Sequence, residues 1–274
     1  MAFSAAVLIL CGTAHTAELK QKTADAFNRY VAVTEQRMAN ELKTGNGFLY
    51  PDHPAGNRPG EMRDAYQRLK HGEILVARQE TTLDGKQVDV PDGMVHHWVG
   101  IVFIPGANLE QVVAVARDYD RRAEMYKPEV IASRTIFHQG DEYRIFLRLY
   151  ENRFTTVVFN TDYNIHWGRL GDSRAYSDSL STRVAEVKDP DHPEGPEEPV
   201  GQGHGYLWRL NTYWRFEEKD GGVYVQCEAL SLTRDIPYGL GWLIKPLVTK
   251  IPKQSLDRAL GRTREAVLER MKGN

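Results

Sequence analysis

Apolar and polar residues alternate along two stretches near the end of the chain, residues 206–217 and 223–232. Alternation with a period of two predicts β-strands that bury one face. The Asp220-Gly221-Gly222 sequence between them is typical of a tight turn, so we expect a hairpin. Residues 252–271 instead repeat apolar positions at helical spacing, after a short apolar segment at 238–248. This order predicts a helix that lies across one face of the sheet.

The two faces of the hairpin differ in polarity. A two-residue turn pairs Phe216 with Val225 and Trp214 with Cys227. The face that carries these residues is mainly apolar, and its members are Trp208, Leu210, Thr212, Trp214, Phe216, Val225, Cys227, Ala229 and Ser231. The opposite face can pair its charges across the strands and tolerates water, and it carries Arg209, Asn211, Tyr213, Arg215, Gln226 and Glu228. The apolar face needs a cover, which the last helix supplies through Leu256, Ala259, Leu260, Thr263, Ala266, Val267 and Met271.

Small side chains on both sides of this interface leave two alternatives open. The strand from Cys227 to Ser231 would face Ala259 and Thr263 of the helix, which leaves space for a cavity. Alternatively, the large aromatic rings of the hairpin fill the space and form a solid core, since protein interiors avoid voids.

The preceding part of the chain predicts further elements of both kinds. Asn108 is a good helix N-cap, and Gln111 stands where a capping box needs it. Helices are expected at 18–42, 61–69 and from 108 to about 119, and strands at 73–82, 94–104, 130–138, 143–150, 154–167 and 173–187. Short connections between consecutive strands predict an antiparallel meander. Residues 188–203 are rich in proline and acidic residues, which predicts a solvated, mobile loop.

The composition is that of an ordinary globular protein, with 26% charged and 41% hydrophobic residues among 274. A formal net charge of −2 gives no basic field that would favour nucleic acid as a partner. Cys227 lies in an apolar strand, which predicts an inert buried thiol.

The beginning of the chain resembles a secretory signal. Residues 2–13 are nearly all apolar or small, and Ala14 and Ala17 offer cleavage sites, although no Lys or Arg precedes the apolar run. We therefore expect a signal peptide at 1–17, a helical extension at 18–72 and the main domain at 73–274, in a periplasmic or secreted protein. Removal of the signal would leave Cys227 alone, without an intramolecular disulfide.

The order of these elements resembles the START-like superfamily, which includes polyketide cyclases and coenzyme-Q-binding proteins. The segments that carry the resemblance are Leu109-Glu110-Gln111-Val112-Val113, Tyr126-Lys127-Pro128-Glu129-Val130, Trp214-Arg215-Phe216-Glu217 and Asp235-Ile236-Pro237. It covers roughly residues 74–272. The resemblance implies an α+β helix-grip fold, a curved antiparallel sheet around a long C-terminal helix, with a pocket for a lipid, sterol, quinone or polyketide between them. It does not imply catalysis.

Candidate metal ligands lack a suitable arrangement. His96 and His97 are adjacent in a strand and so point to opposite faces, while His138 and His166 have no Cys or carboxylate at zinc spacing. We therefore expect no metal site and no cofactor. Arg144 and Arg148 alternate with apolar residues, and we expect them to point outward because unpaired buried arginine is costly.

These patterns predict non-catalytic binding or transport of a hydrophobic small molecule. The residues expected to line the cavity are Trp208, Leu210, Trp214, Phe216, Cys227, Ala229 and Leu260, with Trp242, Leu243 and Leu247 as a gate. Segment 241–248 could be a lid, a membrane contact or a buried connector. One alternative is a cyclase/aromatase-type enzyme that turns Tyr213, Glu228, His97 or Arg148 into the cavity as general acid or base. Another is an interaction module that uses loop 188–203.

Overall fold

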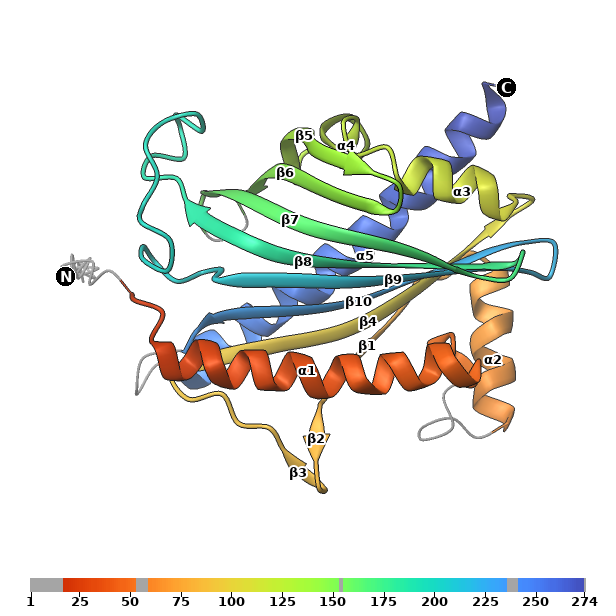
Figure 1. Cartoon of the computed structure of the whole chain (residues 1–274), viewed down its shortest axis with the longest axis horizontal. Coiled ribbons are helices and arrows are strands. Elements are labelled where there is room, and N and C mark those ends of the chain that lie inside the picture. Colours follow the sequence, from red (N-terminus) through yellow and green to blue (C-terminus); the bar gives the residue numbers. More distant parts are fainter. Residues whose placement is uncertain (1–16, 53–58, 153–154, 236–240, 274) are drawn as a thin grey trace, which may run out of the picture.

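A computed structural model describes residues 17–52, 59–152, 155–235 and 241–273. Eight antiparallel strands form one curved sheet in the order β1-β4-β10-β9-β8-β7-β6-β5 (Figure 1). The strands are β1 (Leu75–Arg78), β4 (Gly93–Pro105), β5 (Val130–Gln139), β6 (Glu142–Glu151), β7 (Val157–Leu170), β8 (Arg174–Glu186), β9 (Arg209–Lys219) and β10 (Gly222–Arg234). The helices are α1 (Gln21–Thr44), α2 (Pro59–Lys70), α3 (Leu109–Ala116), α4 (Arg122–Met125) and α5 (Gly241–Lys272), with a 3-10 turn η1 at Tyr50–Asp52.

The C-terminal helix crosses one face of the sheet, and the first helix lies along the other. Figure 1 shows α5 behind the strands and α1 in front of them. The α+β helix-grip architecture expected from the sequence is therefore confirmed. We call the face beneath α5 the inner face and the face beneath α1 the outer face.

The terminal hairpin has the predicted register. Phe216 pairs with Val225, and Trp214 pairs with Cys227. Asp220 and Gly221 form the two-residue turn, and both have positive φ, 60° and 76°, as a type I′ hairpin turn requires. This register turns the apolar alternate residues toward α5, where Phe216, Val225 and Cys227 join the main buried cluster.

Helix α5 approaches the sheet most closely at β4, because Gly100 has no side chain. A Cβ atom at Gly100 would lie 2.6 Å from Leu260 Cδ1 and 3.1 Å from Leu256 Cγ. Both leucines are buried in the main cluster. The closest packing of α5 is thus on the β4 side of the sheet, away from strands β6 to β8.

The polar face of the hairpin does not face water, contrary to the expectation from the sequence. Arg215 and Glu228 are each only 4% exposed, because α1 covers them. Arg215 Nη2 donates to Glu41 Oε2 at 2.6 Å, and Arg37 pairs with Glu228. The polar side chains of α1 therefore supply the partners that water would otherwise supply.

Two local predictions were wrong. The last helix begins at Gly241 instead of near residue 252, so it includes segment 241–248. The first strand of the sheet ends at Arg78, and the unpredicted two-stranded ribbon β2 (Thr82–Leu83) and β3 (Lys86–Gln87) follows it. None of the described helices is both long and apolar enough to cross a bilayer.

The acidic, proline-rich loop 188–203 is tied to the sheet by charge pairs. Arg148 Nη1 donates to Glu194 Oε1 at 2.9 Å, and Glu197 accepts hydrogen bonds from Asn160 and Arg183. The loop also accepts backbone hydrogen bonds from the segment before α1, at Gly201 and Gly203. The loop is therefore held against the sheet, while all its residues except Gly203 are exposed or half-buried, as its composition predicted.

Candidate functional site

A cavity of about 150 Å³ lies between the inner face of the sheet and helices α4 and α5. It is displaced from the terminal hairpin toward strands β6 to β8. The residues that line it are Ala116, Tyr119, Arg122, Tyr126, Val130, Ile145, Leu147, Leu149, Tyr163, Ile165, Trp167, Ser177, Ser179, Leu210, Thr212, Trp214, Phe216 and Thr263.

The alternation of β6 supplies one apolar wall. Ile145, Leu147 and Leu149 line the cavity. Their neighbours Arg144 and Arg148 point to the outer face, where Arg148 hydrogen-bonds Asn160 and Glu194. The prediction that both arginines point outward is therefore correct, because successive strand residues occupy opposite faces.

Stacked aromatic rings fill the part of the inner face beside the cavity. The Trp167 and Phe216 ring centroids lie 5.5 Å apart, with 19° between the ring planes. Trp214 stacks on Phe216 at 6.3 Å. The smaller side chains of Ser177 and Ser179 leave the adjoining space open. The alternatives of solid core and cavity thus both apply, each to a different part of the same face.

A hydrogen bond closes the cavity between α5 and the end of α4. Tyr126 Oη lies 2.7 Å from Thr263 Oγ1, and the Thr263 hydroxyl donates to the Ala259 carbonyl at 2.8 Å. The Thr263 proton is thus used, so Tyr126 is the donor in the first bond. Both hydroxyls of this pair are engaged within the protein.

Arg122 supplies a positive charge beside this hydrogen bond. Its guanidinium carbon lies 5.1 Å from the Tyr119 ring centroid and 4.9 Å from that of Tyr126. Nη2 donates to the Ala116 carbonyl, while the buried Nε has no hydrogen-bond partner among the described residues. Burial raises the pKa of Tyr119 to about 12 despite the nearby positive charge, so the Tyr119 phenol is neutral at pH 7.

The residues predicted to line the cavity occupy three kinds of position. Leu210, Trp214 and Phe216 do line it. Cys227 and Leu260 lie in the packed core beside it, where burial raises the pKa of the Cys227 thiol. Ala229 is half-buried opposite Thr212 of β9. The side chains of Trp242, Leu243 and Leu247 lie outside the described residues, so the predicted gate stays a prediction.

The placement of Trp208 in the cavity was wrong. Its side chain packs in the cluster beneath α1 that includes Phe27 and Leu232. Strand β9 begins only at Arg209, so the alternation that fixes the inner face does not extend back to Trp208. The indole of Trp208 is 4% exposed.

The residues named for an enzymatic alternative do not reach the cavity. His97 Nε2 lies 2.6 Å from Glu228 Oε1 beneath α1, and Tyr213 Oη donates to Glu35 Oε1 at 2.7 Å. Arg148 lies on the outer face. Among the residues that the structure describes, no group of three His, Cys, Asp or Glu side chains could hold a metal ion.

Several lining residues were not predicted. Ile145, Leu147, Ile165 and Ser177 could have been found from the alternation of their strands, once the inner face was known. Arg122 had no such signal, because α4 is a single turn of helix. Its place in the cavity depends on how the segment between α3 and β5 folds back over the sheet.

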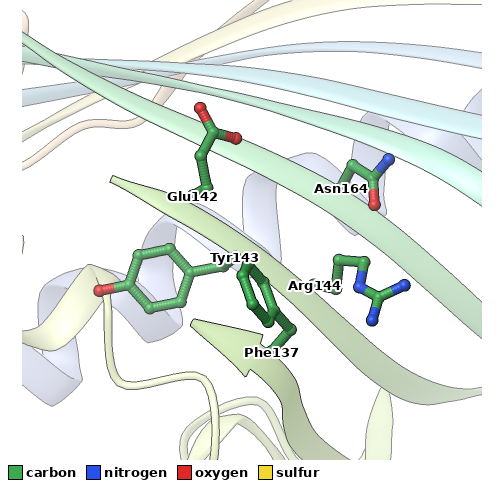
Figure 2. Close-up of a pocket in the computed structure, with 5 residues that line it drawn as sticks. All are labelled: Phe137, Glu142, Tyr143, Arg144 and Asn164. Carbon is green, nitrogen blue, oxygen red and sulfur yellow. The ribbon is translucent and has the colours of Figure 1, made fainter. Parts of the chain in front are cut away.

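A second hollow, of about 310 Å³, lies at the end of the β5–β6 hairpin. It is lined by Phe137, Glu142, Tyr143, Arg144 and Asn164, and it is shallow. Figure 2 shows that Glu142, Tyr143 and Arg144 point in different directions. Their polar groups do not converge on one point, so this hollow lacks the arrangement of a binding site.

Comparison with known proteins gives similarity of fold. No protein-family model matches the chain, and no curated protein matches it in sequence. Similar solved structures include human StAR-related lipid transfer protein 5, at 13% identity over 90% of this chain and 98% of that chain, with a TM-score of 0.49. A STAR-related lipid transfer protein from Xanthomonas axonopodis has 18% identity over 69% of this chain and 97% of that chain, with a TM-score of 0.43.

A third similar structure is the Zhui aromatase/cyclase from Streptomyces sp. R1128. It has 10% identity over 65% of this chain and 96% of that chain, with a TM-score of 0.39. At these identities the similarity concerns the fold alone. The helix-grip fold expected from the sequence is carried by the strand order of the sheet and by the position of α5 across it.

Proposed function

We propose that the protein binds or transports a hydrophobic small molecule, without chemical change, in the cavity between the sheet and α5. The observation that carries the proposal is the cavity itself, walled by Ile145, Leu147, Leu149 and Ile165 and bordered by stacked aromatic rings. Lipid, quinone and polyketide-like molecules all offer the apolar surface that such walls accept. Apolar contact contributes about 25 cal/mol per Å² of buried surface.

The size of the cavity favours a small ligand or a small part of a larger one. A space of about 150 Å³ corresponds to roughly one aromatic ring or a short acyl chain, since an engineered cavity of that size in another protein binds benzene. A bulkier ligand requires α4 or α5 to move away from the sheet. The bond between Tyr126 and Thr263 opposes that movement.

The cyclase/aromatase alternative receives no support from the residues named for it. Tyr213 and Glu228 are engaged with α1, on the opposite face of the sheet. Arg148 is likewise on the outer face, paired with Glu194. A general acid or base must come within hydrogen-bond reach of the substrate, and these side chains do not face the cavity.

The proposal includes export and transient membrane contact. Residues 2–13 have the apolar core of a signal peptide. Segment 241–248 combines Trp242 and apolar residues with Lys245, a composition suited to a membrane interface. Cell fractionation of the full chain and of a chain without residues 1–17 would test export. A cytoplasmic location of the full chain would contradict it.

Native mass spectrometry of gently purified protein would test the binding proposal, followed by titration with 4-nitroanisole, a neutral light-absorbing dye that has one aromatic ring and so suits a cavity of about 150 Å³. Ser177→Leu places a larger side chain in the cavity, so we expect dye affinity to fall at least tenfold. Thr182→Leu, at an exposed position of the same strand, should leave affinity unchanged. Absence of a copurifying small molecule together with absence of dye binding would overturn the proposal.

A further inference from the structure

Among the described residues that line the cavity, Arg122 alone carries a charge. The surrounding walls are aliphatic and aromatic, and the remaining polar groups are hydroxyls and the indole N–H groups of Trp167 and Trp214. Both indole N–H groups donate within the protein, to Tyr119 and Thr212. A guanidinium stays protonated at every physiological pH. Any ligand in this cavity therefore meets one fixed positive charge beside apolar surface.

The position of Arg122 is fixed without a carboxylate. Its guanidinium lies against the rings of Tyr119 and Tyr126, which favour a cation near their faces. Nη2 donates to the Ala116 carbonyl. No carboxylate of the described residues lies within 4.0 Å of the guanidinium nitrogens.

Other arginines of the fold show the more usual arrangement. Arg215, buried beneath α1, pairs with Glu41 at 2.6 Å. Arg258 on α5, half-buried like Arg122, pairs with Glu129. Withdrawing a charge from water without such a pair is costly. The unpaired charge of Arg122 is therefore a feature that a ligand of opposite charge would complement.

The nearby hydroxyl groups of Tyr126 and Thr263 cannot donate to the anionic group of such a ligand. Tyr126 donates to Thr263, and Thr263 donates to the Ala259 carbonyl. Arg122 has five N–H groups, one of which is buried at Nε without an acceptor among the described residues. The strongest free donor at this end of the cavity is thus the guanidinium, which binds carboxylate and phosphate oxygens through two parallel hydrogen bonds.

We infer that the ligand is an apolar molecule that ends in one anionic oxygen group, a carboxylate or a phosphate monoester, bound by Arg122. This inference rests on the proposed function and adds the chemical class of the ligand. The anionic group lies beside Tyr119 and Tyr126, and the apolar part extends along Ile145 and Leu147. The small volume of the cavity favours the carboxylate, which is the more compact group.

Isothermal titration with three ligands of equal chain length tests the inference. The ligands are octanoate, octyl phosphate and neutral 1-octanol. We expect the unmodified protein to bind at least one of the two anions ten times or more tightly than 1-octanol. Arg122→Gln should lower the affinity for that anion to the level of 1-octanol, and Arg122→Lys should retain a few-fold preference. Arg121→Gln changes the exposed preceding arginine and should have no effect.

The possible outcomes separate this inference from the proposed function. Equal binding of all three ligands by the unmodified protein would overturn the inference and leave the proposed function intact. An anion preference that survives in Arg122→Gln would also overturn it. Binding of none of the three would overturn both. The comparison of octanoate with octyl phosphate identifies the anionic group, and it needs no variant.

Discussion

His97 Nε2 lies 2.6 Å from Glu228 Oε1 in the layer between the sheet and α1. The other ring nitrogen of His97 lies 2.9 Å from Tyr30 Oη, which accepts a hydrogen bond from the Thr81 backbone N–H. His97 Nε2 therefore donates to the Glu228 carboxylate, which can only accept, and Nδ1 shares a second hydrogen bond with Tyr30 Oη. This network joins α1 to two strands of the sheet, and Arg37 completes it by pairing with Glu228.

Glu228→Gln should destabilise the protein strongly. Burial disfavours the carboxylate, but the hydrogen bond from His97 and the charge of Arg37 outweigh it and hold the pKa of Glu228 below its ordinary value. Removing one partner of a buried charge pair costs about 3–5 kcal/mol. We expect a loss of that size in urea denaturation at pH 7.

The control for Glu228 is Glu265→Gln, which changes an exposed glutamate paired with Arg262. Exposed pairs contribute about 0–1 kcal/mol, so little change is expected. Because the pKa of Glu228 is lowered, its stabilising contribution is present above the unfolded glutamate pKa, about 4.3, and disappears as the pH falls below it. A loss below about 1 kcal/mol at pH 7 would show that the pair is not a major contributor.

His96 should make the free energy of unfolding depend on pH, in a pH range above the one in which Glu228 acts. Burial, with a smaller effect of the Arg78 charge, lowers the pKa of His96 from 6.5 to about 4. Below pH 6.5 the unfolded chain therefore binds a proton that the folded protein does not bind, and stability falls with falling pH. Between pH 6.5 and pH 5 the expected loss is about 2 kcal/mol, at 1.36 kcal/mol per unit.

Urea denaturation between pH 7 and pH 5 measures this effect. His96→Gln should flatten the pH dependence, because glutamine does not titrate and can still reach Thr233, which His96 contacts at 3.1 Å. His192→Gln changes an exposed histidine and should leave the slope as it is. An unchanged slope in His96→Gln would refute the assignment.

Much of the fold could be predicted from the sequence, because it depends on local patterns. The Asp220-Gly221 turn fixed the register of the hairpin, and alternation placed Trp214 and Phe216 on the inner face. The predicted placement of Trp208 on the inner face was wrong, because Trp208 lies just before the first residue of β9. Alternation identifies a face only within the limits of a strand.

The position of the cavity could not be predicted, because it depends on how α5 crosses the sheet. Gly100 admits Leu256 and Leu260 close to β4, which moves the open space toward β6 to β8. The covering role of α1 was also missed. Its polar stripe, with Glu35 and Glu41, resembles a solvated surface until Tyr213 and Arg215 are seen to hydrogen-bond with it.

Gly100→Ala should destabilise the packing of α5. The added methyl group would lie 2.6 Å from Leu260 Cδ1, so Leu260 or the helix must shift. Overpacking of this kind costs about 1–3 kcal/mol. The control is Gly261→Ala on α5 itself, where the nearest atom is Ile74 Cδ1 at an ordinary 3.6 Å. That change should stabilise the protein by up to about 1 kcal/mol, since alanine favours helix over glycine.

Thermal and urea denaturation of the two glycine variants gives the comparison. Opposite signs of the stability change are expected because only Gly100 lies where helix and strand meet closely. Equal changes at both positions would show that α5 does not pack tightly against β4. A lower dye affinity in Gly100→Ala than in Gly261→Ala would further indicate that the displaced helix alters the cavity.

The hydrogen bond between Tyr126 and Thr263 should couple α4 to α5 energetically. Thr263→Val keeps the shape of the side chain but leaves the buried Tyr126 hydroxyl without its acceptor, at a cost of about 1–3 kcal/mol. Tyr126→Phe removes the donor, and the double variant removes both groups together. We expect the double variant to lose less stability than the sum of the single variants, by about 0.5 kcal/mol or more. Urea denaturation of the unmodified protein, the two single variants and the double variant measures this difference. If the losses of stability add within about 0.3 kcal/mol, the two hydroxyls contribute independently. Apolar packing alone would then close the cavity.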